Sequence, residues 1–233
     1  MSLKHMIHAG LVTCEVGLPT IAESILGRVQ RSACDARLDR WSKALVDAAR
    51  ISIEVHGKHH MQGDEAFVVI SNHQSHYDIP VLFQSYDKPI RMVAKRELFR
   101  IPVMGAAMRA AGFPELDRQR RERAIQSLSA ASRALGSGMS IWIAPEGTRS
   151  VDGRLAPFKK GGFRMAIDAR ARILPVTIDG TRRTLVAKGR KVNEGQTVRV
   201  TFSEPVDTSG VDREHLTLLM DRVRGAIAQH LEV

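Results

Sequence analysis

The chain has 233 residues, of which 43% are apolar and 26% are charged, and this composition excludes a disordered chain and predicts one folded domain with at most a small appendage. Lys and Arg number 35 against 25 Asp and Glu, and the net charge of +10 favours anionic partners: nucleic acid, phosphorylated small molecules or an anionic membrane surface. Because aromatic residues make up only 5% and no dense basic tract or zinc-finger spacing is present, we expect no nucleic acid partner.

The cysteines and the first residues bear on the cellular setting. Cys14 and Cys34 are too few for a disulfide framework or a clustered metal site, and they predict a reduced cytosolic setting. Residues 1–24 are mildly apolar but are interrupted by Gly, Pro and Glu. They lack both the ~20-residue apolar run of a spanning helix and the cleavage pattern of a signal peptide. We therefore expect a cytoplasmic protein that is soluble or peripheral to the membrane, not integral.

Two helices are predicted in the first 50 residues. Residues 20–23, Thr-Ile-Ala-Glu, form a capping-box pattern, and behind it apolar residues recur at helical spacing: Ile21, Ile25 and Val29. Ser32 with Asp35 could start a second helix. Its apolar face carries Leu38, Trp41, Leu45 and Ala48, and its basic residues are Arg37, Arg40, Lys43 and Arg50. Such a basic amphipathic pair fits a bilayer surface or a hairpin packed on its own core, and the sequence leaves both open.

From Ile51 onward, strand and helix patterns alternate. Residues 51–55 alternate apolar and polar, and short apolar runs typical of buried strands follow at 66–70, 90–94, 140–144 and 173–177. Helical stretches lie between them at 80–86, 102–111, 121–135 and 161–169. Residues 196–202 indicate a more exposed strand, and residues 212–231 a terminal helix. This order predicts an α/β fold with a mainly parallel central sheet flanked by helices, residues 51–233, after an N-terminal amphipathic helical segment, residues 1–50.

Residues 71–80, SNHQSHYDIP, place two histidines and an aspartate directly after a predicted buried strand. A metal site is disfavoured, because His73 and His76 are three residues apart with no Cys nearby. A second histidine group has no carboxylate pattern of its own: His56, His59 and His60. A catalytic pair fits better: Asp78 can fold back to accept the Nδ1–H of His73 and leave Nε2 as a base. On spacing alone, a structural histidine in a polar loop stays a rival.

Further polar clusters could bind an anion. Residues 145–150, Pro-Glu-Gly-Thr-Arg-Ser, combine a turn at Gly147 with Thr148 and Arg149, which can bind an oxyanion, although an exposed turn with a stray Arg is the alternative. Residues 158–163 add charge and glycine before a helix. Residues 112–118 end in Arg118, for which we predict contact with a phosphate. The arginines that follow are expected on a solvated helix face: Arg120, Arg121 and Arg123.

Taken together and in order, these stretches resemble the glycerolipid acyltransferase family of the 1-acyl-sn-glycerol-3-phosphate acyltransferase type. The first block, Asn-His-x-Ser and then Asp with four residues between His and Asp, is similar to residues 72–78. The second block resembles residues 112–118, the third residues 145–150 and the fourth residues 173–176, and residues 94–105 are also similar. In place of a clear membrane-inserting segment, this chain has only a mild apolar stretch at residues 6–26 and the Trp41 helix.

The resemblance implies direct transfer of a fatty acyl group from acyl-CoA or acyl carrier protein to lysophosphatidic acid at an anionic membrane surface, without metal or other cofactor. It implies that His73 is the general base, with Asp78 as its partner, and that His76 lines the site. Phosphate binding falls to the following residues: Lys95, Arg118, Glu146, Gly147, Thr148 and Arg149. Transfer to another acceptor (glycerol 3-phosphate, a lysophospholipid or an aminolipid), a His/Asp metal-dependent hydrolase and a non-catalytic lipid-phosphate binding protein are the alternatives.

Overall fold

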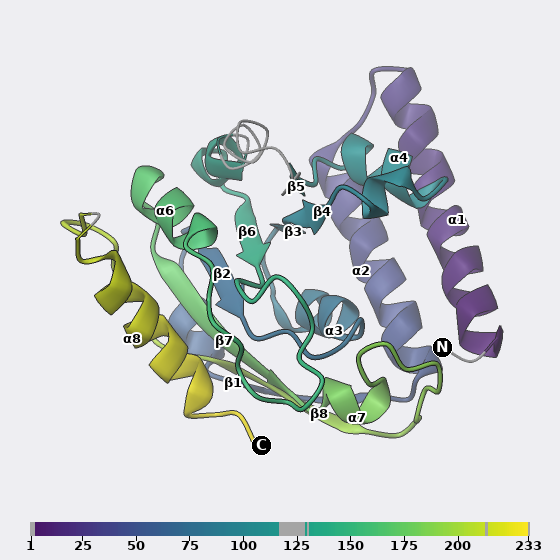
Figure 1. Cartoon of the computed structure of the whole chain (residues 1–233). Coiled ribbons are helices and arrows are strands. Elements are labelled where there is room, and N and C mark those ends of the chain that lie inside the picture. Colours follow the sequence, from purple (N-terminus) through teal and green to yellow (C-terminus); the bar gives the residue numbers. More distant parts are fainter. Residues whose placement is uncertain (1–2, 117–128, 130, 213, 233) are drawn as a thin grey trace.

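A computed structural model describes residues 3–116, 129, 131–212 and 214–232 of the chain (Figure 1). Arg118, Arg120, Arg121 and Arg123 lie outside the described residues. So does most of the helix predicted at residues 121–135, of which residues 131–135 are helical as expected.

A six-stranded sheet forms the centre of the molecule, in the order β1-β8-β7-β2-β6-β3 (Figure 1). Its strands are β1 (Ser52–His56), β2 (Val68–Ser71), β3 (Ile90–Met92), β6 (Ser140–Ile143), β7 (Ile173–Asp179) and β8 (Thr197–Phe202). The pairs β1–β8, β7–β2, β2–β6 and β6–β3 are parallel, and only β7–β8 is antiparallel. The predicted mainly parallel α/β fold is therefore confirmed. A second, two-stranded sheet pairs β4 (Ala94–Lys95) with β5 (Glu115–Leu116).

The continuous apolar runs of the strands follow from burial of both faces of the sheet. Successive side chains of β2 point to opposite faces, so Val69 joins one hydrophobic core and Val68 and Ile70 join the other. Helices α3 (Asp78–Ser85) and α2 (Arg31–Ala48) cover the first core, whereas α6 (Gly161–Asp168) and α8 (Leu216–Ala228) cover the second. The shorter elements are η1 (Lys58–Met61), η2 (Leu98–Arg100), α4 (Met104–Ala110) and α7 (Thr181–Thr184).

The last strand agrees with the sequence prediction, whereas the last helix is shifted. The strand predicted at 196–202 is β8, and it is more exposed than β2, β6 and β7, as expected: its apolar residues are buried between β1 and β7, but Thr197 is exposed and Arg199 is half-buried. The terminal helix starts at Leu216 instead of residue 212. The Asp212 carboxylate accepts the backbone N–H groups of Glu214 and His215, at 2.8 and 2.9 Å, and these bonds hold a turn before the helix.

The first helix is longer than its capping-box pattern predicted. Helix α1 runs through Leu3–Ile25, and Val29 lies beyond it. Thr20 does not cap a helix start, because its hydroxyl donates to the Val16 carbonyl one turn earlier, at 2.9 Å. Gly17 lets α1 approach α4 closely: a Cβ at this position would lie 3.0 Å from Val103 Cγ1. Packing on α4 thus stabilises a helix that continues through residues 20–23, where the capping-box pattern predicted a helix start.

Helix α2 packs against α1 and α3, and the basic residues that the sequence placed on its polar face form ion pairs. The Trp41 indole N–H donates to Thr13 Oγ1 on α1, and its ring centroid lies 6.4 Å from that of Phe83 on α3. The cations have acidic partners on both helices or in the loop before β8: Arg37 with Glu23, Arg40 with Glu15, Lys43 with Asp47 and Arg50 with Glu194. For α2, the reading as a hairpin packed on its own core is therefore correct. The division into residues 1–50 and 51–233 stays a prediction.

A buried arginine ties α2 to the sheet. Arg91 on β3 is 1% exposed, and its guanidinium donates to Asp35 Oδ1 on α2 at 2.6 Å and to the Ala111 carbonyl at 2.7 Å. The guanidinium carbon also lies 5.5 Å from the centre of the Phe113 ring. A buried charge is stable only with such partners, so this pair fixes α2 against β3 and the end of α4.

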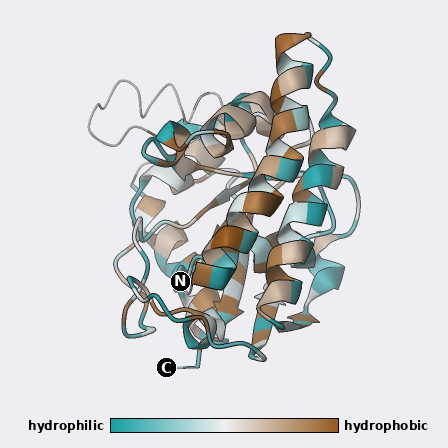
Figure 2. Ribbon diagram, turned by 90° about the vertical axis from the view of Figure 1, so that its right-hand side faces the viewer, coloured by the Kyte–Doolittle hydropathy of each residue, from teal (hydrophilic) through white to brown (hydrophobic). Residues whose placement is uncertain are grey.

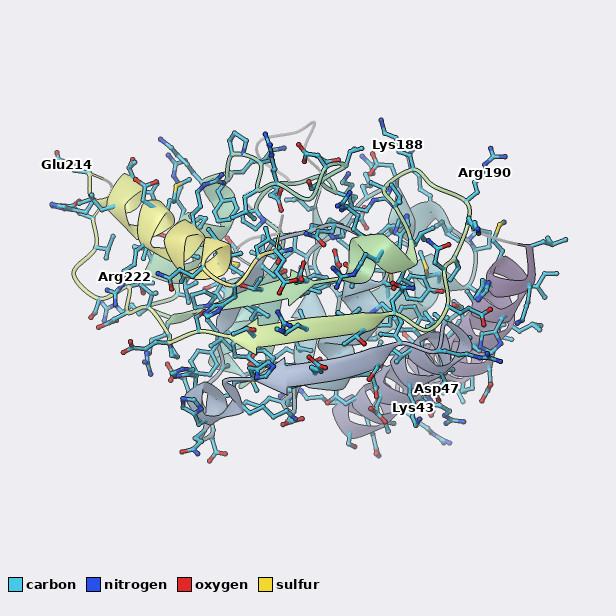
Figure 3. All side chains as sticks on the ribbon, turned by 90° about the horizontal axis from the view of Figure 1, so that it is seen from below. Lys43, Asp47, Lys188, Arg190, Glu214 and Arg222 are labelled. Carbon is cyan, nitrogen blue, oxygen red and sulfur yellow. The ribbon has the colours of Figure 1, made fainter. Side chains whose placement is uncertain are left out.

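We expect Asp35→Asn to lower the free energy of unfolding by about 2 kcal/mol, because a hydrogen bond to a buried charged group contributes roughly 1.5–3 kcal/mol. Urea denaturation followed by circular dichroism measures this loss. The matched control is Asp47→Asn on the same helix. Its pair with Lys43 is exposed (Figure 3), so the loss there should stay below about 1 kcal/mol. Equal losses in the two variants would contradict the role given to Arg91.

Candidate active site

Polar segments follow four neighbouring parallel strands at one edge of the sheet. Three of them contain residues predicted from the sequence: residues 72–78 follow β2, residues 145–150 follow β6, and β4 follows β3. The fourth, Gly180 with Thr181 after β7, was not predicted. The carboxyl ends of parallel strands meet at one edge, where α/β folds commonly bind ligands. The sheet order β7-β2-β6-β3 therefore brings together segments that lie more than 100 residues apart in the sequence.

His73 and Asp78 form the predicted pair. Their Nδ1 and Oδ2 atoms are 2.6 Å apart, across the turn that joins β2 to α3. Because Nδ1–H donates to the carboxylate, the Nε2 atom of the neutral ring carries the lone pair and can accept a proton. The His73 side chain is 20% exposed, whereas that of Asp78 is fully buried. The pair is thus an accessible imidazole held by an inaccessible carboxylate.

The Asp78 carboxylate is enclosed by donors. Oδ2 also accepts the backbone N–H groups of Gln74 and Ser75, at 2.7 and 2.9 Å. Oδ1 accepts the hydroxyl of Thr181 at the start of α7. A buried carboxylate needs such bonds to stay charged, and charge-assisted bonds are among the stronger ones in proteins. Asp78 thereby organises its own loop as well as the imidazole.

The ring of His73 is also oriented by β6. Its centroid lies 6.5 Å from that of Trp142, with the planes at 86°, an edge-on contact. Trp142 is itself fixed, because its indole N–H donates to Ser71 Oγ at 2.9 Å. The imidazole therefore has contacts that fix both its position and its tilt.

Both carboxylate oxygens of Glu146 accept hydrogen bonds from backbone N–H groups. Its Oε1 accepts the N–H of His73 and its Oε2 accepts the N–H of Ala156, both at 2.8 Å. Burial raises the pKa of this carboxyl, and the two backbone N–H groups oppose that rise. Ser150 adds a further link, since its N–H donates to the His73 carbonyl at 2.7 Å. The loop after β6 thus supports the backbone of the loop after β2 that carries His73.

The loop after β6 turns at the buried Gly147, and the two residues that follow it have the exposure that an anion site needs. Gly147 adopts a φ of 75°, which places it in the left-handed region that favours glycine, and it forms a tight turn with its N–H on the Ala144 carbonyl. Thr148 is exposed and Arg149 is half-buried. Among the described residues, the Arg149 guanidinium has no carboxylate partner. It lies close enough to His76 to affect its ionisation.

The pKa of His76 is lowered to about 4, first because neighbouring protein atoms reduce the hydration of the charged ring and then because of the Arg149 charge. Although His76 is exposed at the surface, the positive charge of Arg149 favours the neutral ring whatever the exposure. His76 is therefore neutral at pH 7 and adds no positive charge to the site.

Lys95 lies further along the same edge. It is exposed on β4, and the register pairs it with Leu116 on β5, two residues before Arg118. Among the residues described, no group of three or more His, Cys, Asp or Glu could hold a metal ion. A shallow hollow of about 320 Å³ lies elsewhere, between α1 and α4, and none of the candidate site residues lines it.

Sequence reasoning missed three features of this site. The Asn72 side-chain amide binds both the N–H and the carbonyl of Ile178 on β7, each at 2.8 Å. Sequence reasoning also missed Trp142 and Thr181. Only the position of Thr181, after a glycine that follows the fourth block, could have indicated it.

The acyltransferase family model matches residues 52–179. The chain is 35% identical over 175 residues to 1-acyl-sn-glycerol-3-phosphate acyltransferase alpha of Homo sapiens, covering 75% of this chain and 62% of that protein. It is 34% identical over 170 residues to the chloroplastic 1-acyl-sn-glycerol-3-phosphate acyltransferase BAT2 of Brassica napus, covering 73% and 48%. The matched region therefore spans only 48–62% of the length of these relatives.

A solved structure resembles nearly the whole chain. The 1-acyl-sn-glycerophosphate (LPA) acyltransferase PlsC from Thermotoga maritima is 27% identical and superposes with a TM-score of 0.74, covering 97% of this chain and 95% of that one. The family model alone spans more than half of the chain and contains both the His73–Asp78 pair and the loop after β6. On these grounds, the chain belongs to the acyltransferase family.

Proposed function

We propose that the protein transfers a fatty acyl group from an acyl thioester, acyl-CoA or acyl carrier protein, to the sn-2 hydroxyl of 1-acyl-glycerol 3-phosphate, and so produces phosphatidic acid for phospholipid biosynthesis. The observation that carries the proposal is the His73–Asp78 pair, on the same loop as His76, which lies close enough to the half-buried Arg149 to feel its charge. The names of the relatives favour this acceptor over glycerol 3-phosphate, other lysophospholipids and aminolipids.

The geometry suits direct transfer. The acceptor hydroxyl attacks the thioester carbonyl while His73 Nε2 takes its proton, and Asp78 stabilises the imidazolium that forms. The tetrahedral intermediate then collapses with cleavage of the C–S bond, and the imidazolium returns the proton to the leaving thiolate. The thioester is already activated, so the protein needs only to supply a base and to orient the acceptor hydroxyl toward the thioester carbonyl. Neither step needs a Ser or Cys nucleophile.

Capture of the acceptor phosphate falls to the loop after β6. Arg149 can offer two parallel N–H donors to a phosphate, and Thr148 and the turn at Gly147 stand beside it. We include Lys95 and Arg118 in this role, since the β4–β5 pairing sets Lys95 beside Leu116, which precedes Arg118 by two residues in the sequence. Glu146 is a positioning residue, because both of its oxygens are bound to backbone N–H groups.

Attachment to an anionic membrane surface is proposed for α1. No helix among the described residues is long and apolar enough to cross a membrane. Nevertheless, α1 carries apolar residues along its length, drawn in brown in Figure 2. Six of them, at helical spacing on one face, are each at least 53% exposed: Leu3, Met6, Ile7, Leu11, Leu18 and Ile25. An apolar face of this extent, which the other described residues leave uncovered, fits the interfacial region of a bilayer.

Cations accompany this apolar face. The loop between α7 and β8 exposes Lys188, Arg190 and Lys191, and the first two project away from the molecule (Figure 3). The same loop contacts the start of α1, since Lys4 lies 3.5 Å from Glu194. Each cation near an anionic bilayer contributes about 1 kcal/mol to attachment. We therefore place the protein on the cytoplasmic face of the membrane, beside its lipid substrate.

His73→Ala should lower kcat for acyl transfer to lysophosphatidic acid by ~10²–10⁴-fold, because general-base catalysis contributes that much. Purified protein is assayed with acyl-CoA and, separately, with acyl carrier protein as donor. The control is His215→Ala, since His215 also has a carboxylate 2.8 Å from its Nδ1, on Asp212, but both are exposed at the surface. Full turnover in the His73 variant would remove the mechanism.

Arg149→Ala should raise KM for lysophosphatidic acid by ~10–100-fold, since charge-assisted hydrogen bonds are worth roughly 1.5–3 kcal/mol. The KM for the acyl donor should change little. Arg154→Ala, an exposed arginine in the same loop, is the control. A monoacylglycerol without phosphate serves as the second acceptor, and the Arg149 variant should lose the preference of the wild type for the phosphorylated one. If that preference persists, the phosphate is bound elsewhere.

Ile7→Glu combined with Leu11→Glu should abolish co-flotation of the protein with vesicles that contain anionic lipid, because two charges then interrupt the apolar face of α1. Turnover on substrate dispersed in detergent should be retained. Leu218→Glu is the matched control, because Leu218 is 66% exposed on α8, away from α1. Unchanged flotation of the double variant would show that α1 does not carry the attachment.

A further inference from the structure

A hydroxyl from a distant part of the chain completes the shell around the catalytic carboxylate. Thr181 is fully buried at the start of α7, and its Oγ1 donates to Asp78 Oδ1. The other three donors, from His73, Gln74 and Ser75, all bind Oδ2. Thr181 is therefore the one group among the described residues that holds the oxygen facing away from the imidazole.

The fold fixes Thr181 at this place through both ends of its short helix. Asn72 locks the end of β7 to the end of β2 by its two bonds to Ile178. The chain then turns at Gly180, which has a φ of 105° and where a Cβ would lie 2.6 Å from the Thr197 carbonyl oxygen. At the other end of α7, the Leu185 carbonyl accepts the hydroxyl of Ser75 at 2.7 Å. The catalytic loop and α7 thus form one hydrogen-bonded unit.

We propose that Thr181 is a positioning residue for acyl transfer, acting through Asp78 on the His73 imidazole. The inference rests on the proposed role of His73 as the base. A carboxylate turns easily about its last side-chain torsion, so donors on both oxygens are needed to hold Oδ2 toward Nδ1 of His73. Without the Thr181 hydroxyl, Oδ1 would be buried and unpaired, and the carboxylate would turn to share its remaining donors.

The first test uses Thr181→Val, which keeps the shape of the side chain and removes only the hydroxyl. We expect kcat to fall by ~10–100-fold, as for loss of a hydrogen bond to a charged group, with KM for both substrates nearly unchanged. Thr181→Ser should recover most of the turnover, because it restores the donor. The matched control is Thr184→Val on the same helix. Thr184 is equally buried, but its hydroxyl has no hydrogen-bond partner among the described residues, so its loss should not change kcat.

A second readout does not depend on turnover. Proton NMR of the wild type should show a far-downfield resonance for the proton between His73 Nδ1 and Asp78 Oδ2, whose atoms are 2.6 Å apart. The resonance should move upfield in Thr181→Val and stay in place in Thr181→Ser and Thr184→Val. The assignment is made by its loss in His73→Ala.

The turnover and NMR results test the role of Thr181 and the proposed acyl transfer independently. If the wild type transfers no acyl group to lysophosphatidic acid, the proposed function fails, and the NMR comparison still decides whether Thr181 positions Asp78. If Thr181→Val keeps both full turnover and an unmoved resonance, the positioning role is wrong. It is also wrong if Thr181→Val loses turnover together with thermal stability and Thr181→Ser fails to recover it, because Thr181 would then serve folding alone.

Discussion

The site depends on the cost of burying the Asp78 carboxylate. A charge shielded from water is stable only if its oxygens accept hydrogen bonds, and those of Asp78 accept four, from its own loop, from the imidazole and from α7. These hydrogen bonds do more than offset the cost of burying the charge. They join the turn after β2 to the segment after β7, so the position of the imidazole is determined by the sheet and not by a loop alone.

A second buried carboxylate, Glu146, has a different role at the same edge of the sheet. Both of its oxygens accept backbone N–H groups, so it fixes the main chain around His73 while Asp78 fixes the ring. Because these two acids are bound to other groups, neither neutralises the nearby Arg149, which remains available to an anion. This division of roles explains how the proposed phosphate site at Arg149 and two acids can lie at one edge of the sheet without neutralising each other.

In the N-terminal helices, too, some side chains have partners within the protein and others do not. Cations of α2 meet acids on α1 and on α2 itself, Arg50 just after α2 meets Glu194 before β8, and Trp41 of α2 contacts α1 and α3. What stays uncovered is the apolar face of α1, together with the basic loop that follows α7. The buried Arg91–Asp35 pair ties this layer to β3. A surface suited to lipid is thus joined rigidly to the strands that carry the site.

The sequence by itself determined the α/β class, the strand positions and the His73–Asp78 pair, because apolar runs and a five-residue spacing are local properties of the chain. It did not determine the true start of α1, since packing on α4 overrides local pattern there, or the place of β8 between β1 and β7. Only the tertiary structure decided that Glu146 holds backbone, that Asn72 reaches β7 and that Thr181 reaches Asp78. Those bonds join residues 10 to 106 positions apart, and they exist only because the sheet order makes distant strand ends neighbours.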